Sequence, residues 1–288
     1  MSNNQSLQQV INREDIRKRF EDMLGSNAAS FLSSILTLVN SNNKLKECST
    51  ASILSAAGIA AALNLPISPS LSFAYIVPYK VGNNYQAQFQ ISSKGLTQLA
   101  MRSGQYRKLH AGPVLEGQVK DIDFITGDLI RGEKVSDKVV GYVGYLELLN
   151  GFSKTLYMTK EEIAAHAKRY SQSYAYDLKN NRKTSVWSTN FDAMAKKTVL
   201  KLLLAKYGVM SIDMRSTDMA VALSADQAVI KDDGSYRYID NEHPKYEGNI
   251  VNFSDVIGIE SADDIDNDIS PSEMDEIETI ETTNTPNN

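Results

Sequence analysis

The distribution of charge along the chain constrains its fold more than any single motif. Residues 1–223 carry 27 Lys and Arg against 18 Asp and Glu, whereas residues 224–288 carry 3 against 17. A basic body is typical of proteins that bind a polyanion, most often nucleic acid. An acidic segment with few large apolar residues buries too little surface to fold alone. We therefore predict a folded core over residues 1–223 and an acidic, largely disordered tail over residues 224–288.

Cysteine usage and hydropathy indicate the compartment in which the chain works. Cys48 is the single cysteine, which excludes an intramolecular disulfide and suits a reducing cytosol. Residues 1–20 are polar and charged, unlike a secretory signal peptide. The sequence contains no run of about 18 apolar residues, the length that a membrane span requires. We expect a soluble intracellular protein without membrane contact.

The order of helical and strand-like segments predicts the fold class. Helical spacing and capping residues predict helices over residues 13–24, 28–40, 50–63, 93–103, 160–170 and 188–207. Segments rich in β-branched and aromatic residues predict strands over residues 73–80, 85–91, 106–120, 138–149 and 152–158. Residues 171–186 are polar and are predicted to form a loop. Because few helices separate successive strands, we predict an α+β fold, a single core domain with a mostly antiparallel sheet packed against helices.

One segment combines basic and aromatic residues. Residues 154–206 carry 11 Lys and Arg against 4 Asp and Glu, and they include the aromatic residues Tyr157, Tyr170, Tyr174, Tyr176, Trp187 and Phe191. Cations neutralise phosphates, and flat side chains stack on exposed bases. The same composition also suits a solvated helix surface with aromatic residues in the core.

The predicted helix over residues 188–207 sharpens this prediction. At about 100° per residue, one apolar stripe comprises Phe191, Ala195, Val199 and Leu202, and Lys197 and Lys201 lie away from it. Two like charges four residues apart repel each other, and a polyanion along that face would remove the repulsion. Plain exposure to solvent is the alternative for both lysines.

Catalytic signals are weak. Asp121 and Asp123 would share one face of a strand and could hold Mg²⁺ together with Glu147, which leaves a metal-dependent nuclease as an alternative function. The three histidines are far apart in sequence, and none has metal-ligand spacing with another. The sequence lacks the Gly-x-x-x-x-Gly-Lys-Ser/Thr motif, which disfavours an ATP-driven recombinase. A third possibility is a structural oligomer whose basic face packs against other subunits.

Three stretches resemble the RecT family of phage-type single-strand annealing proteins, relatives of the Redβ group. The first is Ala61-Ala-Leu-Asn-Leu-Pro66 with Leu71-Ser-Phe-Ala-Tyr-Ile-Val-Pro-Tyr-Lys80. The second is Ala87-Gln-Phe-Gln-Ile-Ser-Ser-Lys-Gly-Leu-Thr-Gln-Leu-Ala-Met-Arg-Ser-Gly104, although we expect a bulkier aromatic residue at Ser93. The third comprises Tyr157-Met-Thr-Lys160, His166-Ala-Lys-Arg-Tyr-Ser171, Trp187, Phe191-Asp-Ala-Met-Ala-Lys-Lys-Thr-Val-Leu-Lys201 and Lys206-Tyr-Gly208. The resemblance covers about residues 10–220.

The resemblance implies a function and a set of partners. It implies a protein, not an enzyme, that coats single-stranded DNA and pairs it with a complementary strand without ATP during homologous recombination and repair. It implies rings or helical filaments of many copies in the cytoplasm of a bacterial host, and a 5′→3′ exonuclease encoded by a phage or prophage. It also implies contact between the C-terminal part and the host single-strand-binding protein. We expect no cofactor and no specific metal site, with Mg²⁺ at most assisting.

Combining charge and resemblance, we expect a basic groove that holds one DNA strand by its phosphates. The residues expected to contact phosphates are Lys160, Lys168, Arg169, Lys196, Lys197 and Lys201. A second basic edge, for which scattered surface charge is the alternative, comprises Lys94, Arg102, Arg107 and Lys108. Tyr170 and Trp187 could stack on bases, with core packing the alternative for Trp187. The N-terminal helices are candidate contacts between subunits.

Overall fold

The computed structural model describes residues 2–81, 84–209, 214–230 and 236–238. Several of its helices begin at the capping residues that the sequence predicts. Ser49 caps helix α5 (Thr50–Ala62), and Ser92 caps helix α6 (Ser93–Ser103). The predicted capping box opens helix α7 (Lys160–Tyr170), where Thr159 and Glu162 satisfy each other's backbone amides.

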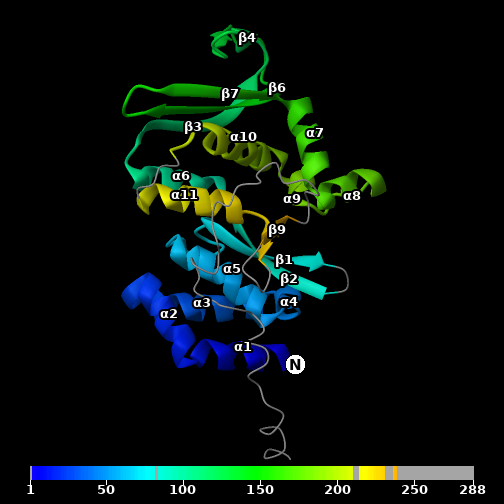
Figure 1. Cartoon of the computed structure of the whole chain (residues 1–288). Coiled ribbons are helices and arrows are strands. Elements are labelled where there is room, and N and C mark those ends of the chain that lie inside the picture. Colours follow the sequence, from blue (N-terminus) through cyan, green and yellow to red (C-terminus); the bar gives the residue numbers. More distant parts are fainter. Residues whose placement is uncertain (1, 82–83, 210–213, 231–235, 239–288) are drawn as a thin grey trace, which may run out of the picture.

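The elements stack in successive layers from one end of the molecule to the other (Figure 1). Four helices and a 3₁₀ turn form the first layer: α1 (Ser2–Asn12), α2 (Glu14–Leu24), η1 (Gly25–Asn27), α3 (Ala28–Ser41) and α4 (Asn43–Lys46). Helix α5 lies between this layer and the hairpin of β1 (Ala74–Val81) and β2 (Asn84–Ile91), and its residues 50–61 are all buried. The main hydrophobic core is therefore centred on α5 and β2.

A second core lies beneath a three-stranded antiparallel sheet at the other end of the molecule. Its strand order is β3 (Tyr106–Leu115), β6 (Val139–Leu148) and β7 (Ser153–Thr159), with β6 in the centre. The predicted Asn150-Gly151 turn joins β6 to β7, with Gly151 at a φ of 88°. Helix α10 (Phe191–Tyr207) packs against all three strands. It connects the sheet to the rest of the molecule, since it also contacts α6 and α11 (Met214–Ala225).

These features confirm the predicted α+β class with antiparallel sheets in a single core domain. In addition, among the described residues, no helix combines the length and the apolar character needed to cross a bilayer.

Three predictions of local structure were wrong. The strand predicted over residues 106–120 ends at Leu115, and the chain then forms a separate hairpin of β4 (Val119–Ile122) and β5 (Leu129–Arg131). The loop predicted over residues 171–186 contains α8 (Gln172–Asn180), whose first turn is capped by Ser171. The helix predicted over residues 188–207 is two helices, α9 (Val186–Thr189) and α10, because Asn190 caps the second one.

The folded core reaches beyond residue 223. Helix α11 runs to Ala225, and strand β8 (Ala228–Ile230) pairs with β9 (Tyr236–Tyr238). The backbone amide of Gln227 donates to the carbonyl of Phe89 at 3.1 Å, which attaches this segment to β2. The rest of the tail predicted to be largely disordered, residues 239–288, lies outside the described part of the chain.

A close approach of backbones at Gly95 yields the first testable prediction. A Cβ at this position in α6 would lie 2.3 Å from the carbonyl oxygen of Phe73 and 2.6 Å from Cγ1 of Ile91. Helix propensity alone would favour Gly95→Ala by about 1 kcal/mol. Because overpacking outweighs this gain, we expect a net loss of about 1–3 kcal/mol in the free energy of unfolding, measured by denaturant titration. Ser93→Ala in the same helix is the control, and equal stability of the two variants would contradict the prediction.

Candidate nucleic-acid interface

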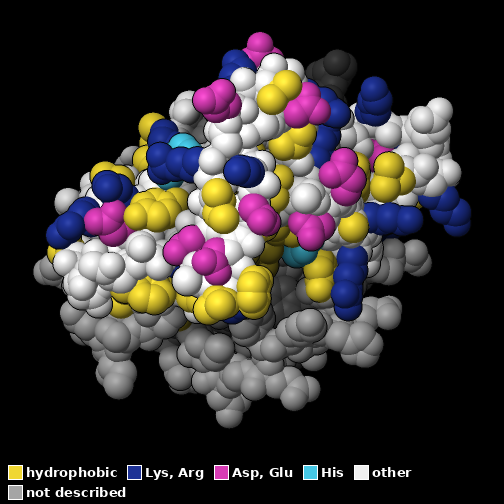
Figure 2. Space-filling model, turned by 90° about the horizontal axis from the view of Figure 1, so that it is seen from above, with side chains coloured by type: hydrophobic (Ala, Val, Ile, Leu, Met, Phe, Trp, Pro, Cys, Tyr) yellow, Lys and Arg dark blue, Asp and Glu magenta, His cyan; other side chains and the backbone are white. Residues whose placement is uncertain are grey.

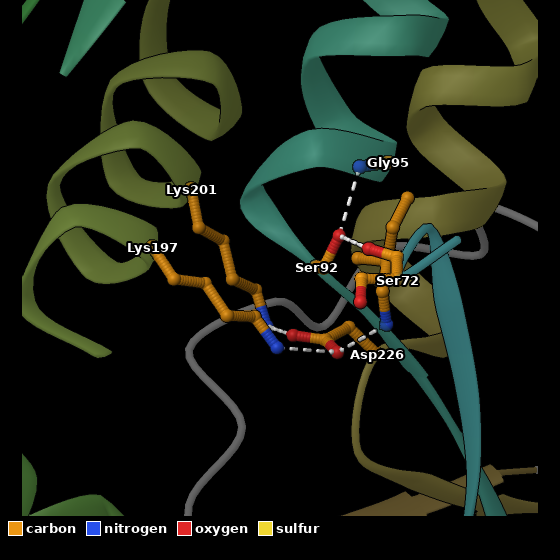
Figure 3. Close-up of polar contacts among 7 residues, drawn as sticks. Ser72, Ser92, Gly95, Lys197, Lys201 and Asp226 are labelled. Carbon is orange, nitrogen blue, oxygen red and sulfur yellow. Dashed lines mark hydrogen bonds and ion pairs between the residues drawn. The ribbon is translucent and has the colours of Figure 1, made fainter. Parts of the chain in front are cut away.

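A buried ion cluster joins three elements that are distant in sequence. Lys197 and Lys201 extend from α10 to the carboxylate of Asp226, which follows α11 (Figure 3). The ammonium-to-carboxylate distances are 3.1 Å for Lys197 and 2.8 Å for Lys201. The same carboxylate accepts a hydrogen bond from the backbone amide of Ile91 in β2 at 3.0 Å. Asp226 is fully buried, so α10, α11 and β2 meet at one charged side chain.

The charges of this cluster are mutually dependent. Burial alone would raise the pKa of Asp226, but the two ammonium groups hold it below its ordinary value. Burial lowers the pKa of Lys197, and Asp226 opposes that shift. Two cations therefore face one anion, and the cluster keeps a formal charge of +1 in the interior. Such a group is strongly coupled, because removal of the carboxylate leaves buried cations without a partner.

The exposed position predicted for Lys197 and Lys201 was wrong. Their side chains retain only 12% and 28% of their full exposure. The reason is that α10 is covered on two sides, by the three-stranded sheet and by α6 and α11. The face of α10 opposite its apolar stripe therefore packs against α6 and α11 instead of facing water. Their expected role as phosphate contacts stays a prediction, and in this structure their charges are directed at Asp226.

Several other predicted phosphate contacts also have partners within the chain. Lys196 pairs with Asp192 at 2.6 Å, one turn earlier in α10. The ammonium group of Lys94 donates to the carbonyl of Leu71 and lies 4.4 Å from the centre of the Phe73 ring.

Arg102 binds the carboxyl end of α5. Its guanidinium donates to the carbonyls of Leu63 and Asn64 at 2.8 and 2.9 Å. These carbonyls belong to the C-cap residue and the residue after it, at the helix end where helical partners are missing and positive charge is favoured. Arg102 therefore contributes to the attachment of α6 to α5.

Glu147 binds Arg107 and Lys108, the other two residues of the predicted second basic edge. Arg107 and Lys108 of β3 contact its carboxylate at 3.3 and 3.1 Å, and Tyr145 donates to it at 3.1 Å. The hydrogen bonds from Lys108 and Tyr145 hold the pKa of Glu147 below its usual range.

Asp123, one of the carboxylates considered as a Mg²⁺ ligand together with Glu147, accepts two backbone amides of its own turn. Across the part of the chain that the structure describes, no three acidic, His or Cys side chains group as a metal site would require, so the nuclease alternative gains no support.

Helix α7 carries the predicted residues that remain open to solvent. Lys160, Lys168 and Arg169 are exposed, and none forms an ion pair with a described residue. The Arg169 guanidinium lies 5.2 Å from the centre of the Tyr170 ring, a cation–π arrangement that places a flat surface beside a charge. The structure brings these four residues together on one helix.

His166 connects α7 to the buried cluster. Its ring lies 4.5 Å from that of Tyr170, four residues later in the same helix. Burial, together with the positive charges of Lys201 and Arg169, lowers the pKa of His166 to about 4. The imidazole is thus neutral near pH 7 and adds no charge to the group of cations around it.

Helix α8 and the loop between α8 and α9 contribute cations that the sequence analysis did not select. Lys179, Arg182 and Lys183 are exposed and form no ion pair with any described residue. The Arg182 guanidinium lies 5.8 Å from the ring of Tyr176, which is half exposed. All belong to the basic and aromatic segment over residues 154–206, but the prediction of a loop over residues 171–186 gave no reason to place them together.

Asp177 holds α8 and α9 in place. Its buried carboxylate accepts hydrogen bonds from the backbone amides of Thr184 and Ser185 and from the hydroxyls of Thr184 and Ser188, at 2.6–2.9 Å. Although burial alone would raise its pKa, the donors Ser188, Thr184 and Ser185 hold the pKa of Asp177 well below its ordinary value. The segment of residues 160–189, here called the basic arm, therefore has a defined conformation.

Trp187 packs within the protein. Its side chain is 7% exposed, and its ring centre lies 5.5 Å from that of Phe191 and 5.9 Å from that of Tyr174. This geometry favours the core-packing alternative over stacking on a base.

Seen from the end that carries β4, the surface mixes both signs of charge (Figure 2). Lys and Arg side chains alternate with Asp and Glu, and several basic side chains stand at the edge where α7 and α8 lie. Seven of the twelve predicted contacts have polar partners within the chain, and the basic arm holds the largest set of exposed cations without an ion pair among the described residues.

Comparison with known proteins places the chain in a family. The sequence profile of the RecT family matches residues 29–244. The chain belongs to the RecT family. It is 39% identical to the uncharacterised protein YqaK of Bacillus subtilis (strain 168) over 233 residues, 80% of this chain and 73% of YqaK. It is 30% identical to Protein RecT of Escherichia coli (strain K12) over 210 residues, 68% of this chain and 74% of that protein. The family match includes both the basic arm and Asp226, and membership supports a role in recombination by single-strand annealing.

The buried cluster predicts a large cost for loss of its carboxylate. We expect Asp226→Ala to lower the free energy of unfolding by about 3–5 kcal/mol, because Lys197 and Lys201 are left without their counter-charge. Asp137→Ala, which removes an exposed ion pair with Lys134, should cost no more than about 0.5 kcal/mol. Denaturant titration monitored by circular dichroism measures both, and a similar small cost for the two variants would contradict the assignment.

Proposed function

We propose that this RecT-family protein binds single-stranded DNA along the basic arm and anneals complementary strands without ATP, as an oligomer. The observation that carries the proposal is the set of exposed cations on residues 160–189 that have no ion pair among the described residues. Elsewhere in the predicted set, Lys or Arg side chains bind carbonyls, Asp192, Glu147 or Asp226. The cations of the arm are those whose charge is still available to phosphates.

The chemistry of annealing fits a binding surface without a catalytic centre. Pairing of complementary strands is thermodynamically downhill, so no nucleotide fuel is required. The obstacles are repulsion between two polyanions and the search for register. Cations that bind the phosphates of one strand lower the repulsion and leave the bases free for pairing, and Tyr170 and Tyr176 offer flat surfaces for transient stacking.

The proposed setting follows from family membership. We place the protein in the cytoplasm of a bacterial cell, beside a phage or prophage 5′→3′ exonuclease that produces the single strand. The C-terminal part is the proposed contact for the host single-strand-binding protein. We propose no catalytic residue and no resident cofactor, and Mg²⁺ would act only by screening the phosphates.

Strand annealing without ATP is the direct test. Two complementary labelled oligonucleotides should pair faster with the protein than without it, in the absence of nucleotide, and both strands should keep their length when Mg²⁺ is added. Shortened strands would favour the nuclease, and failure to bind DNA at low salt would favour the structural oligomer.

The salt dependence of binding tests the assignment to the basic arm. Each phosphate neutralised on single-stranded DNA contributes roughly 0.7 to the slope of log affinity against log salt. Lys168→Ala/Arg169→Ala should therefore lower the slope by roughly 1.4 and weaken binding to all sequences equally. Lys120→Ala/Arg131→Ala, which removes one exposed Lys and one exposed Arg from β4 and β5, is the matched control. Equal slopes for both variants would remove α7 from the interface. Lys197→Ala is unsuitable for this measurement, because it disturbs the buried cluster.

A further inference from the structure

The tip of the β4–β5 hairpin is held in one conformation by the chain itself. Asp123 accepts hydrogen bonds from the backbone amides of Ile125 and Thr126 at 2.8 and 3.1 Å. The ammonium group of Lys154, on β7, donates to the carbonyl of Thr126. Gly127 adopts a φ of 74°, which suits a residue without a side chain. A turn fixed from both sides presents its side chains in a constant geometry.

The side chains presented at this tip are apolar. Phe124 is 92% exposed and Ile125 is 80% exposed. A rigid turn that holds a large aromatic and a β-branched residue in water gains nothing for its own fold. Exposed apolar groups of this kind mark interaction sites, and aromatic anchors dominate binding energy at interfaces.

The charged residues nearest to the apolar pair in sequence are acidic, with the cations Lys120 and Arg131 farther from the turn. Asp121 in β4 and Asp128 just before β5 are exposed, and neither forms an ion pair with a described residue. The partner surface should therefore offer exposed apolar groups surrounded by cations.

The chain itself carries a surface of that composition on α8 and α9. Leu178 and Val186 are each more than half exposed. Their backbones are near each other, because their neighbours in sequence, Asp177 and Ser185, are joined by a hydrogen bond of 2.7 Å. The exposed cations Lys179, Arg182 and Lys183 lie between them in the sequence. We call these five side chains the α8–α9 patch.

The tip and the α8–α9 patch cannot meet within one molecule. The hairpin protrudes at one end, and α8 projects at the side of the arm (Figure 1). We propose that the β4–β5 tip of one copy docks on the α8–α9 patch of a second copy, with Phe124 and Ile125 against Leu178 and Val186. Such a contact is head-to-tail, so it continues from copy to copy and generates rings or filaments. The proposal rests on the proposed self-association and names the surfaces that produce it, which leaves the α7 cations Lys160, Lys168 and Arg169 as the part of the basic arm that binds DNA in the assembly.

A charge-swap experiment tests the contact without DNA. One variant makes the tip basic (Asp121→Lys/Asp128→Lys), and the other makes the patch acidic (Lys179→Glu/Lys183→Glu). Each variant alone repels itself, and we expect the concentration needed for assembly to rise by about tenfold or more, measured by sedimentation velocity. Mixing the two restores complementary charges at every contact, so assembly should return to the level of the unmodified protein.

Apolar truncation provides the second measurement. Phe124→Ser should weaken assembly by about tenfold or more, with an unchanged melting temperature. Met101→Ser, which removes an exposed apolar side chain from α6, should leave assembly unchanged.

The possible outcomes separate the docking contact from the proposed function. If the unmodified protein does not assemble, the proposed oligomer fails together with the contact. If it assembles but Phe124→Ser assembles equally well, only the docking surfaces are wrong. If the acidic-patch variant loses DNA binding and mixing does not restore assembly, the patch serves DNA and the docking contact is overturned.

Discussion

The carboxylate of Asp226 is the constraint on which the arrangement of the elements depends. It receives two ammonium groups from α10 and a backbone amide from β2. The buried carboxylate of Asp226 therefore fixes α10, which lies against the three-stranded sheet, relative to the β1–β2 hairpin that packs on α5. Apolar packing alone would tolerate small shifts between these layers, whereas three directional contacts to one side chain permit little displacement. The basic arm, which comprises α7, α8 and α9, leads directly into α10, the helix that carries both lysines.

Local chemistry predicted most of the elements, and tertiary contacts explain the failures. The Thr159 capping box and the Asn150-Gly151 turn are short-range signals, and both formed as expected. The burial of Lys197 was not predictable from helical geometry, since the opposite face of α10 meets α11 rather than water. The partner of Lys197 is Asp226, which follows α11 and begins the acidic part of the sequence. The sequence analysis therefore placed Asp226 in the tail, beyond the predicted boundary at residue 223. The arm was identified as a basic and aromatic segment, but its second helix was missed.

The structure separates cations that serve the fold from cations available to a ligand. Arg102 stabilises the end of α5, and Arg107 and Lys108 share Glu147 on the sheet. Net charge cannot distinguish these two uses, because a lysine in an internal ion pair and an exposed lysine without one contribute the same charge to a count from the sequence. What distinguishes them is the presence of an acceptor from another part of the chain. Lys168 and Arg169 have no ion-pair acceptor among the described residues, and this places the candidate interface on the arm.

The contact between Ile91 and Asp226 joins residues 135 positions apart in the sequence. During synthesis, β2 leaves the ribosome long before its acidic partner has been made. Lys197 and Lys201 likewise emerge before the residue that neutralises them. Long-range contacts of this kind slow folding, and they prevent the N-terminal half from reaching its final arrangement alone. Lys197 and Lys201 consequently lack their buried counter-charge until translation has passed α11.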